Sequence, residues 1–253
     1  MPTIQRVCIN QIFWLAYGMI FDDTLLKGKL VKRYKRFFAE IILDNKETVI
    51  AHCANSGSML SVSKPSAEVW VSRATNPNRK LKYTLELIKI ENSLVGVNTN
   101  LPNRLVSEAI YQGKISELDG YDSLQREVKY GENSRIDILL KNPDGAECYV
   151  EVKSVTMRRK IEKNYPAEFP DSVTKRGQKH LIELSKMVLM GHRGVMLYLI
   201  QRNDSDYFSI ARDIDPEYGL EYDKAKEIGV ETIAYDCNIS PQFISINNKI
   251  KEI

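Results

Sequence analysis

Three residues in the middle of the chain have the types and the spacing that phosphate chemistry needs. Asp137 is followed by a Glu-X-Lys motif formed by Glu151 and Lys153. Two carboxylates on a rigid sheet suit Mg²⁺ or Mn²⁺, hard cations that bind a few carboxylate oxygens and keep several waters. A nearby lysine can hold a phosphate or lower the pKa of an attacking water. Because two close carboxylates repel each other, the pKa of one of them should be raised.

Two strands must bring these side chains together. Residues 135–140 and 148–153 are rich in β-branched and aliphatic residues, and the segment 141–145 between them carries Pro, Asp and Gly. This pattern predicts a β-hairpin, and alternation along its strands can place Asp137, Glu151 and Lys153 on one face. The alternative is structural, because exposed charges on a half-solvated sheet are ordinary.

The surroundings of the hairpin favour the chemical interpretation. Glu127 lies on a preceding predicted strand and is a candidate third acid, and a helix is predicted soon after the hairpin. Two acids, a Glu-X-Lys motif and a helix in this order are typical of the restriction-endonuclease-like nuclease core.

The 253-residue chain has the composition of a globular protein, with 43% hydrophobic and 27% charged residues. Its length predicts one large or two small domains. The formal net charge of +3 is too small to indicate nucleic-acid binding by itself, so the distribution of basic residues matters more. The four cysteines are scattered without a Cys-X-X-Cys pair, which argues against a zinc site and a disulfide scaffold and favours reduced cytosolic thiols.

An apolar segment at residues 12–21 follows Arg6 and has the character of a weak signal peptide. It is too short for a transmembrane helix, and Asp22 and Asp23 follow it directly, without a small-residue cleavage site. We therefore expect a cytoplasmic protein that does not bind membranes, in which residues 1–20 form an N-terminal extension. A translation start at Met19 is the other explanation for this segment.

Residues 21–102 show several short strand patterns separated by turns, which predict a small β-barrel. The sequence from Leu25 to Phe38 is basic with interleaved aromatic residues, which suits a nucleic-acid backbone and its bases. A solvated strand whose lysine stems cover apolar surface is the alternative, and this run alone leaves both open. The candidate DNA-binding residues of this part are Lys32, Arg33, Lys35, Arg36, Arg79 and Lys80.

A domain boundary is predicted close to Pro102, where a helical pattern begins, so residues 103–253 form a second domain. This domain has the order helix, three strands, helix and strand, with additions, and the predicted fold class is therefore α/β. The polar segment 157–171 is long for a loop, and a helix should run from the cap residue Thr174 to Met190. The candidate DNA-binding residues of this part are Arg158, Arg159, Arg176 and Lys179. Beside the last two, His180 is either a site residue that contacts phosphate or a half-buried helix residue.

Eight short segments carry a resemblance to a known family: residues 33–37, 52–59, 78–81, 131–137, 151–155, 169–174, 176–181 and 213–216. From about Phe21 to the C-terminus, they resemble the sugar fermentation stimulation protein A family. One departure lies at residues 61–63, where the family usually has a glycine. The resemblance implies an N-terminal OB-type barrel that binds DNA and a C-terminal domain of the restriction-endonuclease-like, PD-(D/E)XK fold. It also implies DNA binding without sequence specificity and a regulatory link to sugar utilisation.

Two functions follow from these observations. The first is a DNA-binding protein that acts on double- or single-stranded DNA, largely without sequence specificity. The second is a divalent-metal-dependent nuclease, in which Asp137 and Glu151 bind Mg²⁺ or Mn²⁺ and Lys153, Glu127 and His180 are further catalytic candidates. A sugar-responsive regulator is a third class, but nothing in the sequence indicates a sugar site. The sequence does not determine the oligomeric state.

Overall fold

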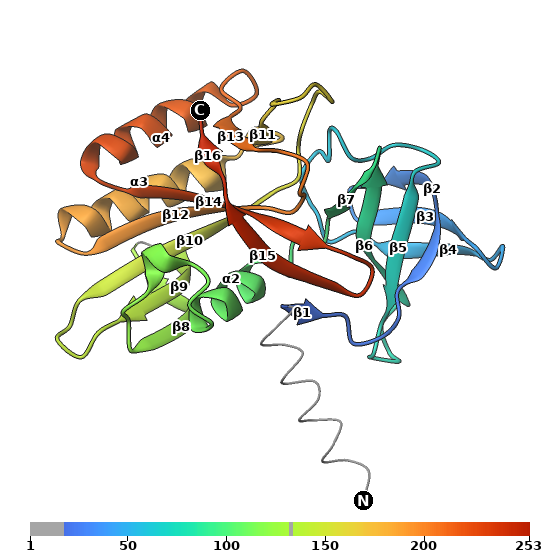
Figure 1. Cartoon of the computed structure of the whole chain (residues 1–253), viewed down its shortest axis with the longest axis horizontal. Helices are drawn as coiled ribbons and strands as arrows, with labels where there is room; N and C mark the ends of the chain where they lie inside the picture. Colours follow the sequence, from blue (N-terminus) through green and yellow to red (C-terminus); the bar gives the residue numbers. More distant parts are fainter. Residues whose placement is uncertain (1–17, 132–133) are drawn as a thin grey trace, which may run out of the picture.

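The computed structural model describes residues 18–131 and 134–253. The predicted extension up to residue 17, and Glu132 and Asn133 of the family-like segment, lie outside the described residues. A β-barrel occupies one end of the molecule and an α/β part occupies the other (Figure 1). Met19–Ile20, at the end of the predicted extension, form β1 and pair with β15 of the α/β part.

Alternating apolar residues build the barrel, because each strand turns one face inward. The strands follow the order β4-β3-β2-β5-β6-β7. A parallel pairing of β4 with β6 closes the first five of them into a barrel, and β7 pairs with β6 outside this closure. The small β-barrel predicted from the sequence is therefore present. Its interior is apolar and includes Leu30, Ile41, Val69 and Leu85. The strands are β2 (Leu26–Tyr34), β3 (Phe38–Leu43), β4 (Thr48–His52), β5 (Glu68–Arg73), β6 (Tyr83–Ile90) and β7 (Ser93–Gly96).

A seven-stranded sheet forms the centre of the α/β part, in the order β1-β15-β14-β12-β10-β9-β8. The middle strands β10, β12 and β14 are parallel, and the continuous apolar run of β12 is buried on both faces, as its sequence predicts. The outer strands pair antiparallel. The strands are β8 (Ser123–Tyr130), β9 (Ser134–Lys141), β10 (Glu147–Val155), β12 (Arg193–Ile200), β14 (Glu231–Ile239) and β15 (Phe243–Lys249).

Helices cover both faces of this sheet. Helices α3 (Lys175–Leu189) and α4 (Pro216–Ile228) pack on one face, and α2 (Pro102–Tyr111) packs on the other (Figure 1). The cap predicted for α3 is present, because Thr174 Oγ1 accepts a hydrogen bond from the Gly177 N–H at 3.0 Å. A short 3₁₀ helix, η1 (Ser116–Leu118), follows α2.

The segment 157–171 is more ordered than the loop expected from its sequence. It contains β11 (Ala167–Phe169), which pairs in parallel with β13 (Tyr207–Ile210), and β16 (Lys251–Glu252) completes this small sheet. Ala167 and Glu168 are buried. A three-residue strand between polar neighbours carries too little periodicity to be distinguished from a loop in the sequence.

The barrel and the α/β part share one apolar core. Trp70 and Leu87 of the barrel belong to the same buried cluster as Leu105 of α2, Val150 of β10 and Ile244 of β15. In the described part of the chain, Cys53, Cys148 and Cys237 carry free, buried thiols. Among the helices described there, none is long and apolar enough to cross a membrane.

Candidate functional site

Asp137 lies where two neighbouring strands separate. The pairing of β9 with β10 runs back along β9 from Lys141 and ends at Ile138, the residue that follows Asp137 in the chain. Its Oδ2 accepts the backbone N–H of Val152 at 2.8 Å, and its Oδ1 accepts a hydrogen bond from Asn103 of α2 at 2.7 Å. The carboxylate is therefore fixed between a strand and a helix.

Glu151 lies at the centre of a buried polar cluster and is 2% exposed. Lys153 Nζ donates to Glu151 Oε1 at 2.8 Å, and His180 Nδ1 bonds to the same oxygen. The Lys153 Nζ also lies 3.0 Å from His180 Nδ1. Glu151 Oε2 is buried and has no hydrogen-bond partner. One oxygen of this carboxylate is thus held in place, and the other is available as an acceptor.

The two carboxylates have opposite pKa shifts. Burial, and then the charge of Glu151, raise the pKa of Asp137 to about 6, although the Val152 N–H, Lys153 and Asn103 act against this rise. For Glu151, burial also disfavours ionisation, but Lys153 and His180 outweigh it and lower the pKa. The expected rise of one pKa of the pair is therefore present, at Asp137.

Helix α3 brings His180 into the cluster. His180 is 5% exposed, and Arg176, one turn earlier on the helix, donates from Nε to His180 Nε2 at 3.3 Å. An imidazole that accepts at Nε2 carries its proton on Nδ1, the nitrogen that bonds to Glu151. Of the two interpretations of His180, the structure places it beside the acids, where it orients Glu151.

Three residues near the cluster were missed in the sequence. Asn103 holds Asp137, while the Tyr130 hydroxyl and both carboxylate oxygens of Glu183 are buried without a hydrogen-bond partner. Lys179 Nζ lies 3.6 Å from Glu183 Oε1. Glu183 follows His180 by three residues and so shares its helix face, which is a signal that the sequence contains. Asn103 has no such signal, because only the packing of α2 brings it to Asp137.

Glu127 lies at the edge of this arrangement. Its side chain is exposed, and its Oε1 lies 3.4 Å from the same Asn103 amide that binds Asp137. Within residues 18–131 and 134–253, no three His, Cys, Asp or Glu side chains are grouped so that they could hold a metal ion. Glu127 and Asp137 thus contact the same Asn103 amide, and Glu127 lies at the exposed edge of the carboxylate pair.

Some of the predicted DNA-binding residues are exposed. Lys35 and Arg36 form the tip of the β2–β3 hairpin, and both have left-handed backbones, with φ of 48° and 61°. Lys80, Arg176 and Lys179 are also exposed. Left-handed residues other than glycine are strained and tend to occur at functional sites.

Lys32, whose side chain is 62% exposed, and Arg33 and Arg79 have contacts within the barrel. Lys32 Nζ is 3.3 Å from Glu40 Oε2, and Arg79 Nη1 donates to Thr84 Oγ1 at 2.9 Å. Arg33 donates to the carbonyl oxygens of residues 36, 55, 57 and 58, and so holds the loop after β4.

Arg158 and Arg159 are the least suited of these candidates to contact DNA. Arg158 has a side chain that is 9% exposed and donates from Nε to the Tyr165 carbonyl at 3.0 Å. Arg159 forms paired hydrogen bonds with Glu168 and Asp213. Carbonyl and carboxylate oxygens of the protein accept the hydrogen bonds of both guanidinium groups, which therefore stabilise the fold of the segment 157–171.

A groove of about 310 Å³ runs between the barrel and the α/β part. Arg36 and residues 55–57 line it from the barrel, and Ser154 with residues 169–174 lines it from the other part. We call it the Arg36 groove. Asp171 fixes its width, because the Met59 N–H donates to Asp171 Oδ2 at 2.9 Å. Arg36 of the β2–β3 hairpin and Ser154 of β10, the residue after Lys153, thus border the same groove.

Two family models match successive parts of the chain. Residues 31–97 match the family model described as the SfsA N-terminal OB domain, and residues 100–243 match the sugar fermentation stimulation protein RE domain. The fold is accordingly an OB barrel followed by a restriction-endonuclease-like α/β domain.

Relatives cover nearly the whole chain. A sugar fermentation stimulation protein homolog from Maricaulis maris is 51% identical over 92% of this chain and 98% of its own length. One from Rhodospirillum rubrum is 51% identical over 88% of this chain and 94% of its own length. The structure of Pyrococcus furiosus SfsA in complex with Ca²⁺ has the same fold, with a TM-score of 0.83 at 23% identity, and the match covers 94% of this chain and 99% of that one. The chain therefore belongs to the sugar fermentation stimulation protein family.

Proposed function

We propose that this protein binds DNA through its phosphate backbone, largely without reading the base sequence. The Arg36 groove carries the proposal, because one cleft is lined by Arg36 of the barrel hairpin and by Ser154 of β10, the strand that bears Glu151 and Lys153. Lys35, Arg36, Lys80, Arg176 and Lys179 are the proposed phosphate contacts, and Arg158 and Arg159 are not among them. Lysine and arginine contacts to phosphate position a duplex without specifying its sequence.

A salt titration tests this proposal. Each phosphate that the protein neutralises releases counterions, so the logarithm of the binding constant should fall linearly with the logarithm of salt concentration, by about 0.9 per contact on duplex DNA. The double variant Lys35→Ala/Arg36→Ala should bind all duplex sequences more weakly, with a slope reduced by about 2. The matched control Lys224→Ala/Lys251→Ala removes two exposed lysines from α4 and β16, away from the groove, and should behave as wild type. A flat salt response, or no binding at low salt, would refute the proposal.

A second candidate function is metal-dependent cleavage of DNA, and the donor set favours it. Asp137 and Glu151 offer hard oxygen ligands, and the buried, unpartnered Glu151 Oε2 is an acceptor that a cation would satisfy. The related protein from Pyrococcus furiosus is described in complex with Ca²⁺, which agrees with a divalent-ion site in this fold. Mg²⁺ or Mn²⁺ would be held by these two residues and would supply Lewis-acid stabilisation of charge on the phosphate.

The protein side chains have separate roles in this second function. Lys153, fixed against Glu151 and His180, would hold the scissile phosphate or orient the attacking water. His180 orients Glu151 and links it to Arg176 at the surface. Asn103 keeps the Asp137 carboxylate in place without contributing charge. The Glu127 side chain is exposed, and its role would be limited to the outer edge of the site.

Calorimetric titration with Mn²⁺, followed by incubation with labelled single- and double-stranded DNA, separates the two functions. Wild type should bind Mn²⁺ and Asp137→Asn should not. Lys153→Ala should retain the ion and lose any cleavage. Mn²⁺ binding without cleavage of either substrate would favour a DNA-binding protein with a vestigial site. No binding to wild type at millimolar Mn²⁺ would leave the cluster as a structural ion-pair network.

A further inference from the structure

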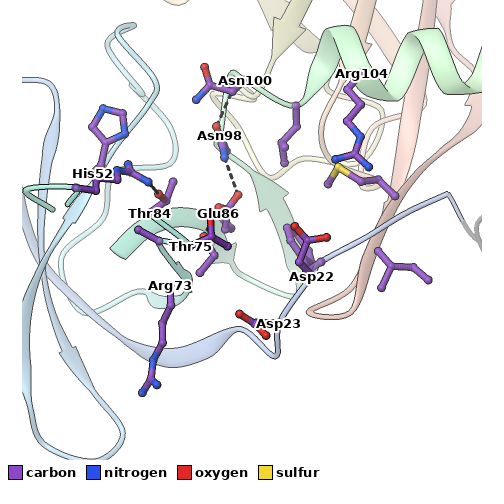
Figure 2. A pocket seen from close by; sticks show the side chains of 17 residues that line it. Asp22, Asp23, His52, Arg73, Thr75, Thr84, Glu86, Asn98, Asn100 and Arg104 are labelled. Atoms are coloured by element: carbon purple, nitrogen blue, oxygen red, sulfur yellow. Dashed lines mark hydrogen bonds between the residues drawn. The ribbon is translucent and has the colours of Figure 1, made fainter. Parts of the chain in front are cut away.

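A second cavity, of about 370 Å³, lies between the barrel, the segment after β1 and the start of α2 (Figure 2). It shares no lining residue with the Arg36 groove. Its floor comes from β6, and its walls come from the β5–β6 loop and from the linker that leads into α2. We call it the Glu86 cavity. Its volume falls in the range of about 300–1,000 Å³ found for small-ligand sites.

The floor of the cavity is polar, buried and hydrogen-bonded. Glu86 is 5% exposed and Asn98 is 6% exposed. Ser72 Oγ donates to Glu86 Oε1 at 2.6 Å, and Asn98 Nδ2 donates to Glu86 Oε2 at 2.8 Å (Figure 2). Each carboxylate oxygen has a second lone pair, and the Asn98 amide has a second N–H. The floor therefore presents acceptors and a donor side by side in a fixed arrangement.

Charges of both signs line the walls. Asp22, Asp23 and Arg73 line the walls, beside Glu86 of the floor (Figure 2). Arg79 also lines the cavity and donates from Nη1 to Thr84 Oγ1. Arg104 contributes a further guanidinium. The three acids are matched by the three guanidinium groups, so the lining has no net formal charge that would draw a polyanion into the interior. The part of a ligand that enters should be neutral and polar, and an attached phosphate should stay beside an arginine.

An aromatic pair lies next to the cavity. The ring of His52, which lines the cavity, stacks on Phe37 with ring centroids 6.5 Å apart and planes inclined by 14°. Burial, and then Arg79, lower the pKa of His52, so its ring is neutral at pH 7. Phe37 is 45% exposed and directly follows the cations Lys35 and Arg36. Exposed aromatic rings beside cations are the usual stacking platform for unpaired bases.

We propose that the Glu86 cavity takes one unstacked nucleobase, supplied by a single-stranded stretch of nucleic acid or by a free nucleotide. A base is flat, neutral and edged with donors and acceptors, which matches the fixed polar floor. Its phosphates remain outside, beside the exposed Arg73, and a neighbouring base stacks on Phe37. The inference rests on the nucleic-acid binding proposed above and specifies the form that is bound, an unpaired nucleotide.

Blocking the cavity tests the proposal without deleting any of its polar groups. Thr75 lines the cavity and is exposed, so Thr75→Trp should fill the space and leave the fold intact. Asn78→Trp is the matched control, because Asn78 is exposed on the same loop and does not line the cavity. Binding is measured by fluorescence anisotropy with a single-stranded decamer, with the same decamer carrying one abasic position, and with a duplex. Because stacking of one base contributes about 1–3 kcal/mol, Thr75→Trp should weaken single-strand binding by about 5-fold or more.

The outcomes separate this inference from the proposed function. Support requires that Thr75→Trp loses single-strand affinity, that Asn78→Trp keeps it, and that both bind duplex as wild type does. If Thr75→Trp binds the single strand as tightly as wild type, the cavity does not take a base, while binding to duplex would still stand. If wild type binds no DNA, calorimetric titration with nucleoside monophosphates decides. Binding to wild type and not to Thr75→Trp then supports the cavity as a site for free nucleotides, and no binding refutes it.

Discussion

Replacing Asp137 by Asn should change the stability of the protein in a way that depends on pH and on metal. The pKa of Asp137 is raised from its ordinary value of 3.8 to about 6, chiefly by burial and by the charge of Glu151. The folded state therefore binds more protons than the unfolded state between these two pH values. The contribution of Asp137 to the free energy of unfolding is fully present below pH 3.8 and is lost as pH rises through 6, and the difference corresponds to about 3 kcal/mol.

The Asn variant has no carboxylate to ionise, so it avoids this loss. Its side chain can still accept the Val152 N–H, and the Asn103 amide can rotate to accept a hydrogen bond from the new amide group. In metal-free buffer, the stability of the variant relative to wild type should therefore improve by about 2–3 kcal/mol between pH 4 and pH 7.5. By this reasoning, the ionised Asp137 carboxylate destabilises the metal-free protein at neutral pH.

Urea denaturation at pH 4 and pH 7.5, with a chelator present, measures the stability of the variant relative to wild type. The control is Asp206→Asn, which replaces an exposed acid and should give the same relative stability at both pH values. Added Mn²⁺ at a hundred times its dissociation constant should then stabilise wild type by about 2.7 kcal/mol and leave Asp137→Asn unchanged. A difference between variant and wild type that is the same at pH 4 and pH 7.5 would refute the electrostatic argument. Equal stabilisation of both proteins by Mn²⁺ would refute the assignment of Asp137 as a ligand.

Two further substitutions distinguish buried from exposed basic residues. Lys153→Ala leaves Glu151 buried without its ammonium partner and should lower the free energy of unfolding, measured in urea, by about 3–5 kcal/mol. The control Lys141→Ala breaks a pair whose lysine is 37% exposed and should lower it by less than about 1 kcal/mol. Equal losses would contradict the buried-pair argument. Arg33→Ala removes the hydrogen bonds that hold the loop at residues 55–58 and should cost about 2 kcal/mol, whereas Arg36→Ala should change the free energy of unfolding by less than about 0.5 kcal/mol. Lysine lacks the planar guanidinium group that donates several hydrogen bonds at once. If Arg33→Lys is as stable as wild type, Arg33 does not hold this loop through those hydrogen bonds.

The order of strands and helices could be predicted because each has a strong local signal. The hairpin around Asp137, the continuous apolar run of β12 and the cap at Thr174 all depend on residues close together in the chain. The meeting of Asp137, Glu151 and Lys153 also follows from a hairpin, whose register is local. The boundary of 21–102 with 103–253 remains a prediction from the change of pattern near Pro102.

The uses of individual arginines could not be predicted, because their partners are distant in the chain. The sequence presents Arg33, Arg158 and Arg159 simply as positive charges in basic runs. Arg159 finds Asp213 and Arg33 finds the carbonyl oxygens after β4 only when the chain has folded. The contact of Asn103 with Asp137 and the Glu86 cavity arise in the same way, from packing between elements.

The apolar core that joins Trp70 and Leu87 to the central sheet has a consequence for how this family can evolve. A barrel that ended at residue 97 would leave these two side chains without their neighbours on α2 and β15. Recombination that transferred the barrel alone to another protein would thus transfer an aggregation-prone surface with it. We expect the two modules to be inherited together, and gene fusions to add domains at the ends of the pair rather than between its halves.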